Sequence, residues 1–208
     1  VAGMSIDEYA DAIGVPFGED VKAEIAQKTK SAGAEIIKLK GATFNVVANL
    51  DLNNEPWTPI GNEATSFQGT FDGNGKTISN LLVDLTSKRA YQSAGLFGSL
   101  RYAVVKNLTV KNATVKNLDI IGNSSNGAGV IVGSSQFAST IENVKVLNST
   151  VLGNRRVAGI AGYFQGTIKD CVIDNVQITA VPDLLDSGKY DNGDKVGGLI
   201  GYANTAVT

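Results

Sequence analysis

The stretch Val105-Lys106-Asn107-Leu108-Thr109-Val110 recurs along this 208-residue chain as one of five near-copies. The other four occupy residues 47–52 (VANLDL), 78–83 (ISNLLV), 141–146 (IENVKV) and 168–173 (IKDCVI). Their first residues lie 31, 27, 36 and 27 positions apart. A period of about 20–50 residues is typical of solenoids, in which each unit buries its apolar face only by stacking on the next. The repeat therefore predicts a stack of coils.

Positions 1, 4 and 6 of the stretch are apolar, and positions 1 and 4 can both face inward only if the chain bends between them. Position 3 is asparagine in four copies and aspartate in the fifth. Asparagine tolerates a left-handed backbone and suits such a bend. Stacked coils would then place these side chains in one column as a structural hydrogen-bonded ladder. Its predicted members are Asn49, Asn80, Asn107, Asn143 and Asp170.

A second repeated signal is a small-residue motif at residues 94–98 (AGLFG), 128–133 (AGVIVG), 158–162 (AGIAG) and 197–201 (GGLIG). Such residues suit coil corners where two backbones approach closely. A phosphate-binding loop is the other interpretation, but no Lys-Ser or Lys-Thr follows any copy. A local five-residue echo, VKNLT-VKNAT-VKNLDI at 105–120, leaves a pentapeptide-repeat helix as a less favoured fold, because the echo lasts only a few units.

The glycine motifs GLFG, GIAG and GLIG resemble the GLUG motif of large bacterial surface proteins, which also occurs beside the metallopeptidase domain of streptococcal immunoglobulin A proteases. The preceding segments Trp57-Thr58-Pro59-Ile60-Gly61 and 67–78 (FQGTFDGNGKTI) resemble the usual opening of such arrays. The resemblance covers residues 45–208. The copy GVIVG is one residue longer than the motif, so the register of its coil is the least certain.

The resemblance implies an all-β fold, a right-handed parallel β-helix, in exported or cell-surface proteins of gut bacteria that are commonly described as adhesins. It carries no catalytic residue to this chain. The function that follows is a non-catalytic cell-surface or secreted adhesion module, whose surface ligand is unknown and could be a host protein or a glycan. The expected location is secreted or cell-surface, and no signal peptide occurs in this sequence.

The chain divides into two expected parts. Residues 1–34 are predicted to form a short N-terminal helical cap, because Ser5 and Glu8 make a capping box and Gly14 ends an amphipathic segment. Residues 35–208 are predicted to form about five or six coils. The last coil is expected to be incomplete, so that its open edge is continued by the rest of a parent protein or covered by another chain.

The composition limits which partners, cofactors and reactive side chains can be expected. The net charge is −2, which provides no basic field for nucleic acid, so no nucleic-acid partner is expected. The sequence has no histidine, which removes the commonest general base and metal ligand, and no cofactor is expected. The single cysteine, Cys171, cannot form an internal disulfide and is interpreted as an inert core thiol. No apolar run is long enough to span a bilayer.

The alternative function is a β-helix enzyme, either a pectate-lyase-like carbohydrate-processing enzyme or a calcium-dependent one. It depends on an insertion at about residues 182–194, expected as a surface loop. Carboxylates gather in that loop and are weak calcium candidates. They are Asp183, Asp186, Asp191 and Asp194.

Four further sites are interpreted as structural. Asp72 belongs to a tight turn, and Arg155-Arg156 belongs to a solvated turn. Trp57 and Phe71 are expected to cover the first coils, although an exposed aromatic ring could stack on a sugar.

Overall fold

The protein is described by a computed structural model at residues 40–85, 92–118, 126–181, 183–184, 190–191 and 195–203. These residues form β-strands and connections, with no helix among them. The predicted all-β class with parallel strands is confirmed for this part of the chain. The helical cap expected at residues 1–34 lies outside the described residues.

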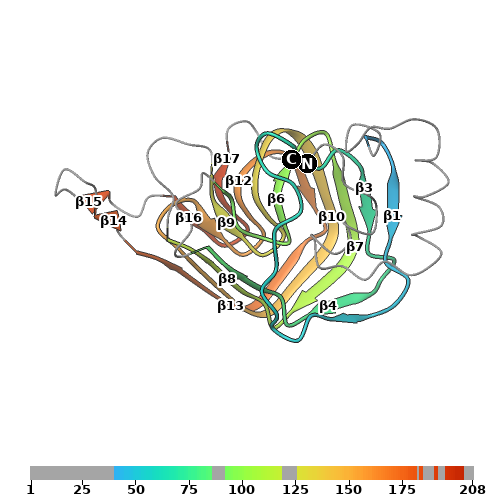
Figure 1. The fold of residues 1–208 in the computed structure, drawn as a ribbon, viewed down its shortest axis with the longest axis horizontal. Coiled ribbons are helices and arrows are strands. Elements are labelled where there is room, and N and C mark those ends of the chain that lie inside the picture. Colours follow the sequence, from blue (N-terminus) through green and yellow to red (C-terminus); the bar gives the residue numbers. More distant parts are fainter. Residues whose placement is uncertain are drawn as a thin grey trace.

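Among the described residues, seventeen strands alternate with short connections (Figure 1). In chain order they are β1 (Thr43–Asn45), β2 (Leu50–Asp51), β3 (Thr70–Asp72), β4 (Thr77–Ser79), β5 (Leu82–Asp84), β6 (Phe97–Leu100), β7 (Val104–Lys111), β8 (Thr114–Asn117), β9 (Ala128–Gly129), β10 (Val132–Gly153), β11 (Val157–Ala158), β12 (Ala161–Lys169), β13 (Val172–Ala180), β14 (Asp183–Leu184), β15 (Tyr190–Asp191), β16 (Val196–Gly197) and β17 (Ile200–Ala203).

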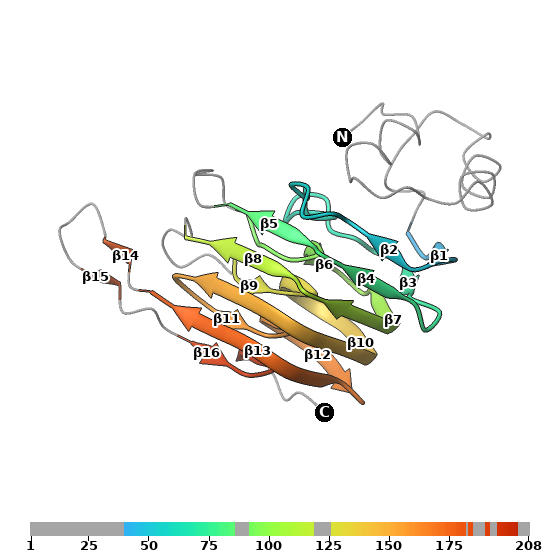
Figure 2. The same cartoon turned by 90° about the horizontal axis from the view of Figure 1, so that it is seen from below.

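Strands from successive repeats pair with one another in parallel. One sheet has twelve strands and runs β1-β3-β7-β10-β12-β17 along its main path, and a three-stranded sheet runs β16-β11-β9. The antiparallel pair β14–β15 stands apart from both. Figure 2 shows β4, β7, β10 and β13 side by side, each one repeat further along the chain. Long parallel strands of this kind need apolar residues on the covered face.

The inward-facing residues form columns that run across the repeats. One column contains Phe44, Phe71, Val105, Ile141 and Ile168. A second contains Leu50, Ile78, Val110, Val146 and Ile173. Because the repeat places a large apolar residue at the same point each time, each residue covers the one before it.

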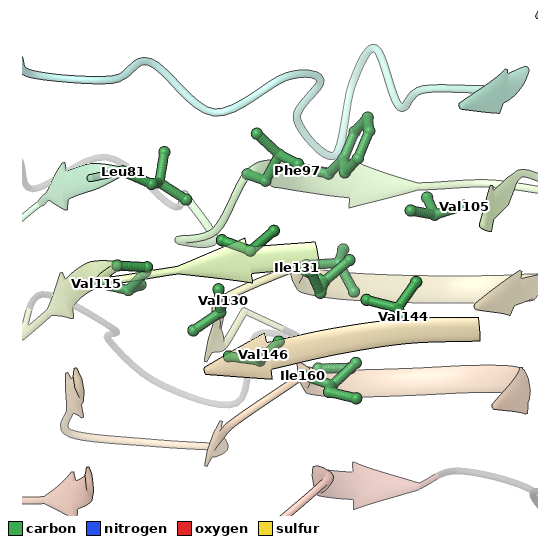
Figure 3. Packing of buried hydrophobic residues seen from close by; sticks show 14 of the residues in the cluster. Leu81, Phe97, Val105, Val115, Val130, Ile131, Val144, Val146 and Ile160 are labelled. Carbon is green, nitrogen blue, oxygen red and sulfur yellow. The ribbon is translucent and has the colours of Figure 1, made fainter. Parts of the chain in front are cut away.

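These columns meet in one hydrophobic core between the sheets (Figure 3). Its largest fully buried side chains include Phe97, Leu81 and Ile131, which point into the space between the strands. Trp57 is also buried, and its indole Nε1–H donates to the carbonyl oxygen of Leu96 at 3.1 Å. Trp57 and Phe71 therefore cover the first repeats from inside. Neither ring is available to a sugar.

The register of the second copy differs from the expected one. The sequence aligns Ile78 with Val105, whereas the structure pairs Ile78 with Val110 and places Phe71 beside Val105. The reason is the five-residue echo. Each coil carries two similar strings, so matching sequence alone selects the wrong one of two nearly equivalent positions.

The last glycines of the four small-residue motifs form a column inside strands β6, β10, β12 and β17, one residue after each strand begins, and not at the predicted coil corner. They are Gly98, Gly133, Gly162 and Gly201, and the flanking residues pair in register. A Cβ on Gly162 would lie 2.5 Å from the backbone nitrogen of Ala128, and one on Gly201 would lie 2.7 Å from the carbonyl carbon of Arg156. The longer motif GVIVG keeps this register, because Val132 pairs with both Phe97 and Ala161. These positions thus have no room for any side chain.

Candidate functional site

The asparagine positions divide between two ladders instead of one. In the first, Asn143 Nδ2 donates to Asn107 Oδ1 at 2.9 Å, and Asn107 Nδ2 donates to Asp72 Oδ1 at 3.0 Å. Glu142 pairs in register with Lys169, so the residues that follow them, Asn143 and Asp170, lie at equivalent positions of successive repeats. All three later members have a left-handed backbone, with φ of 54° at Asn107, 50° at Asn143 and 53° at Asp170.

The second ladder lies five residues beyond Asn107, Asn143 and Asp170, and eight residues beyond Asp72. Asn80 Nδ2 donates to Asp51 Oδ1 at 2.7 Å, Asn112 Nδ2 to Asn80 Oδ1 at 3.4 Å, and Asn175 Nδ2 to Asn148 Oδ1 at 2.9 Å. Asn49 belongs to neither ladder, since its Oδ1 accepts from the backbone N–H of Thr77 at 2.9 Å. The predicted single column is therefore replaced by two, because the five-residue echo supplies two bends to each coil.

The aspartates that begin the ladders are held in the charged form. At Asp72 desolvation opposes this, but hydrogen bonds from Asn107, Asn74 and Lys106 lower the pKa of the carboxyl group below its usual value. The Lys106 Nζ atom lies 3.4 Å from Asp72 Oδ2. At Asp51 the backbone N–H of Asn53 and the amide of Asn80 lower the pKa. These carboxylates act as hydrogen-bond acceptors within the scaffold.

The weak calcium candidates are only partly within the described residues. The backbones of Asp183 and Asp191 pair across the β14–β15 hairpin. Asp186 and Asp194 lie outside the described residues. Among the residues that the structure describes, no three of His, Cys, Asp and Glu are grouped closely enough to hold a metal ion.

Two other candidates from the sequence take part in the scaffold. Arg155 and Arg156 are buried, not solvated as expected, and the Arg156 guanidinium lies 5.5 Å from the Tyr163 ring and 5.6 Å from the Tyr202 ring. Cys171 is half-buried, and its Sγ donates to the carbonyl oxygen of Lys169 at 3.2 Å. Burial raises the pKa of its thiol, with a further contribution from the charge of Asp170, so Cys171 is a poor nucleophile.

A different surface presents exposed aromatic rings. Tyr102 follows β6 and is 60% exposed, and Phe137 in β10 is 37% exposed. Their ring centroids lie 5.6 Å apart, and the Arg101 guanidinium lies 4.0 Å from the centroid of Phe137. We call Arg101, Tyr102 and Phe137 the aromatic–arginine patch. Exposed groups of this composition are typical of binding surfaces, because tyrosine and arginine contribute strongly to interface affinity.

The local backbone fixes the Phe137 side of the patch. The pairing of β10 with β12 shifts register between Ser135 and Ser139, so the intervening residues bulge outward. The Phe137 carbonyl oxygen accepts from Ser135 Oγ at 2.9 Å and from Ser139 Oγ at 3.2 Å, and both serines are buried. These bonds hold the bulge that projects the ring.

Tyr102 is held in an uncommon conformation. Its φ is 50°, in the left-handed region that a bulky residue rarely adopts. The strain persists only where the surrounding structure enforces it, and such positions cluster at functional sites.

Polar groups border the patch. Gln136 Nε2 donates to Glu63 Oε1 at 3.1 Å, next to Phe137 in the chain. Desolvation raises the pKa of the Glu63 carboxyl group, and the charge of Arg156 partly opposes that shift. The patch itself combines two aromatic rings and a guanidinium, which can contact a flat ligand and donate hydrogen bonds to it.

No expectation from the sequence concerned this patch. A retrospective signal is that residues 99–103 (SLRYA) and 134–138 (SSQFA) are equivalent in successive repeats, so that Tyr102 and Phe137 occupy the same position. Phe137 also breaks the alternation of the strand, which is expected at a bulge.

No family model matches the chain. The chain is 35% identical over 158 residues to halomucin of Haloquadratum walsbyi (strain DSM 16790 / HBSQ001), covering 71% of this chain and 2% of that protein. It therefore spans about 2% of the length of this relative. A solved structure described as "a putative immunoglobulin A1 protease from Bacteroides ovatus" is similar at 16% identity with a TM-score of 0.44, covering 79% of this chain and 56% of that chain.

Within the part of the chain that the structure describes, no helix has the length and hydrophobicity needed to cross a membrane.

Proposed function

We propose that this chain is a non-catalytic binding module of a secreted or cell-surface protein, built as a right-handed parallel β-helix of GLUG type, and that it binds a glycan through the aromatic–arginine patch. The observation that carries this proposal is the exposed contact of Tyr102 with Phe137, whose ring planes are inclined at 47°, with the Arg101 guanidinium over the Phe137 ring. Among the large apolar residues that the structure describes as exposed, these two are the aromatic ones.

The chemistry of the patch fits a saccharide better than a peptide. A sugar ring presents C–H groups on its faces and hydroxyl groups around its rim. Flat rings can cover the face, while guanidinium, amide and carboxyl groups exchange hydrogen bonds with the rim. Arg101 over the Phe137 ring is one donor for such hydroxyl groups, and Gln136, the chain neighbour of Phe137, is a candidate for a second. Rings held in place by the Ser135 and Ser139 bonds lose little entropy on binding.

The relative supports the surface location. Halomucin is the protein with which the chain shares 35% identity, and a mucin-like name accords with an extracellular setting. The alignment covers a small part of a much longer protein, as expected for one module of a large surface polypeptide.

The non-catalytic role is favoured by what surrounds the patch. Hydrolysis or elimination on a polysaccharide needs a pair of carboxylates or an equivalent base facing the substrate. The three residues of the patch supply no carboxylate, and the Glu63 carboxylate already accepts a hydrogen bond from Gln136, the chain neighbour of Phe137. We therefore propose binding without turnover.

A glycan array tests the proposal. The wild-type chain should bind a defined subset of saccharides, and Tyr102→Asn and Phe137→Ser should each lose that signal by tenfold or more. Val47→Ser is the matched control, since Val47 is another exposed apolar residue and has no part in the patch. Binding to no saccharide, or binding that survives both patch variants, contradicts the proposal. Release of shortened products during incubation would favour the enzyme instead.

A further inference from the structure

The backbone bends at equivalent places in four successive repeats, and the aromatic–arginine patch lies at two of these bends. Each bend segment is bounded by residues that pair in register from one repeat to the next. The segments are residues 68–69, 101–103, 136–139 and 165–166. The two central segments are therefore longer than the segments before and after them. Because their ends are fixed by the pairing, the extra residues must project outward from the stack.

The rings of the patch lie on the two longer bend segments. Tyr102 is the second residue of one and Phe137 is the second residue of the other, and both are exposed. The shorter segments end in Gly69 and Gly166, which have no side chain. The rings therefore form a ridge with a low position on each side of it. A ligand that covers the rings can extend along the stack in both directions.

The first residues of the four bend segments form a polar column along the same direction. They are Gln68, Arg101, Gln136 and Gln165. Adjacent parallel strands lie about 4.8 Å apart, so these side chains recur at about that interval. A glutamine amide both donates and accepts hydrogen bonds, as a sugar hydroxyl group does. Arg101 is the cation of this column, and the other three members are neutral.

The Arg101 side chain is exposed and is held by the rings. Its guanidinium lies 4.0 Å from the centroid of Phe137 and 5.7 Å from that of Tyr102. A guanidinium that stacks on a ring keeps its N–H groups directed outward in its own plane. None of the ion pairs between described residues involves Arg101. The Glu63 carboxylate accepts from the Gln136 amide at 3.1 Å instead.

Resting on the glycan binding proposed above, we propose that the ligand of the patch is an acidic saccharide, with its carboxylate bound by Arg101 and its chain running along the stack over the two rings. The planar fork of a guanidinium matches a carboxylate through two parallel hydrogen bonds, an arrangement that a single hydroxyl group cannot complete. Charge-assisted bonds of this kind are about twice as strong as bonds between neutral groups.

A neutral saccharide fits the same surface less well. It would cover Arg101 and remove water from the guanidinium without supplying an opposite charge, which is unfavourable. A carboxylate supplies that charge at the point where the structure places the cation. The glutamines of the column can then exchange hydrogen bonds with hydroxyl groups on either side of the acid. The charge and the column together favour an acid group set among hydroxyl groups.

The test compares matched saccharides that differ in one group, with the complete 208-residue chain as the protein. The array carries glucose, galactose and mannose oligosaccharides, each paired with the corresponding uronic acid, and sialylated glycans paired with their desialylated forms. Isothermal titration calorimetry then measures the pairs that bind. We expect the acidic member to bind at least about tenfold more tightly than its neutral partner.

The outcomes separate this inference from the proposed glycan function. Neutral members that bind as tightly as acidic ones, with loss of both in Tyr102→Asn, overturn the acidic class and leave glycan binding standing. Binding to no saccharide overturns both. Tighter binding of a 6-sulfated hexose than of the uronic acid overturns the carboxylate assignment, and so does equally tight binding of an oligoglutamate peptide.

Three variants locate the acid preference. Arg101→Gln removes the charge, and the preference for the acidic member should fall to about twofold or less. Arg101→Lys keeps the charge without the fork and should give an intermediate preference. Lys145→Gln is the matched control, because it removes the same charge from an exposed position of β10 outside the patch and should retain the wild-type preference.

All three side chains are exposed, so each variant should melt close to the wild-type temperature. An acid preference that survives Arg101→Gln overturns the inference. A preference lost equally in Lys145→Gln also overturns it, because the overall charge of the chain and not the Arg101 fork would then select the ligand.

Discussion

Asn143 and Asn107 lie 36 residues apart in the chain, yet the Nδ2 atom of Asn143 lies 2.9 Å from the Oδ1 atom of Asn107. The bond joins two left-handed corners, one directly above the other. Because Asn107 also donates to Asp72, a single side chain connects three levels of the stack. The corner asparagines therefore do two things, since they bend the chain and fix its register.

Replacing Asn107 should separate these two contributions. Asn107→Ala loses both ladder bonds and puts an alanine in a left-handed backbone, and we expect a loss of about 2–4 kcal/mol in the free energy of unfolding. Asn107→Gly loses the same bonds without the backbone strain and should lose about 1–2 kcal/mol. Urea denaturation measures both. Equal losses would mean that the left-handed corner contributes nothing.

Acid should weaken the ladder at its first residue. The folded chain holds the pKa of Asp72 below its usual value of 3.8. The carboxylate therefore contributes stability at pH values above the unfolded pKa, and this contribution is lost as the pH falls below about 4 through the folded pKa. Thermal melts between pH 6 and pH 2 should show a steeper acid loss for the wild type than for Asp72→Asn. Parallel curves for the two proteins would contradict this role.

The glycine column predicts a sharp contrast between two motif glycines. In Gly162→Ala the new Cβ would meet the backbone nitrogen of Ala128 at 2.5 Å, so the two backbones must move apart and we expect a loss of more than about 2 kcal/mol. Gly198→Ala is the matched control, because its Cβ would meet only the Ile173 side chain at 3.5 Å. Its stability should stay within about 0.5 kcal/mol of the wild type. If chemical denaturation gives comparable losses of stability for the two variants, the close backbone approach at Gly162 is not the cause of the loss in Gly162→Ala.

We expect the left-handed backbone at Tyr102 to lower the stability of the fold, while its ring contributes to glycan binding. Its left-handed φ costs about 1–2 kcal/mol relative to a residue that accepts that conformation. Tyr102→Gly should therefore melt at the same temperature or higher, while losing the glycan signal that the wild type gives. Differential scanning calorimetry and the array are read on the same preparations. A lower melting temperature together with unchanged binding would show that the ring serves the fold instead.

The all-β class with parallel strands could be predicted from the sequence because its signals are periodic. Each coil must bury the same face, so the apolar residues and the glycines recur at matched positions, and the parallel pairing follows. The pairing register of the repeats was harder to predict from the sequence. The echo that repeats VKN within residues 105–112 makes two alignments nearly equivalent, and only the packing of Ile78 on Val110 selects between them.

The repeat spacing places Tyr102 and Phe137 at equivalent positions, since they are 35 residues apart, as are the paired residues Ser99 and Ser134. What the spacing does not show is that both rings are exposed and touch each other. Their contact arises from the bulge between Ser135 and Ser139, which the sequence shows only as a polar run. The burial of Arg155 and Arg156 was missed for a related reason, since the aromatic ring of Tyr163 beside Arg156 comes from another strand.

Stacking in parallel register is the central claim, and spin labels on Lys106 and Lys169 test it most directly. Both residues face outward in one column, because each pairs with Glu142 from opposite sides. Two strand spacings of about 4.8 Å place their Cα atoms about 10 Å apart. We predict strong dipolar broadening in the continuous-wave spectrum of the doubly labelled chain, compared with the sum of the two singly labelled spectra. A doubly labelled spectrum equal to that sum, with the labels beyond about 20 Å, would contradict the stack.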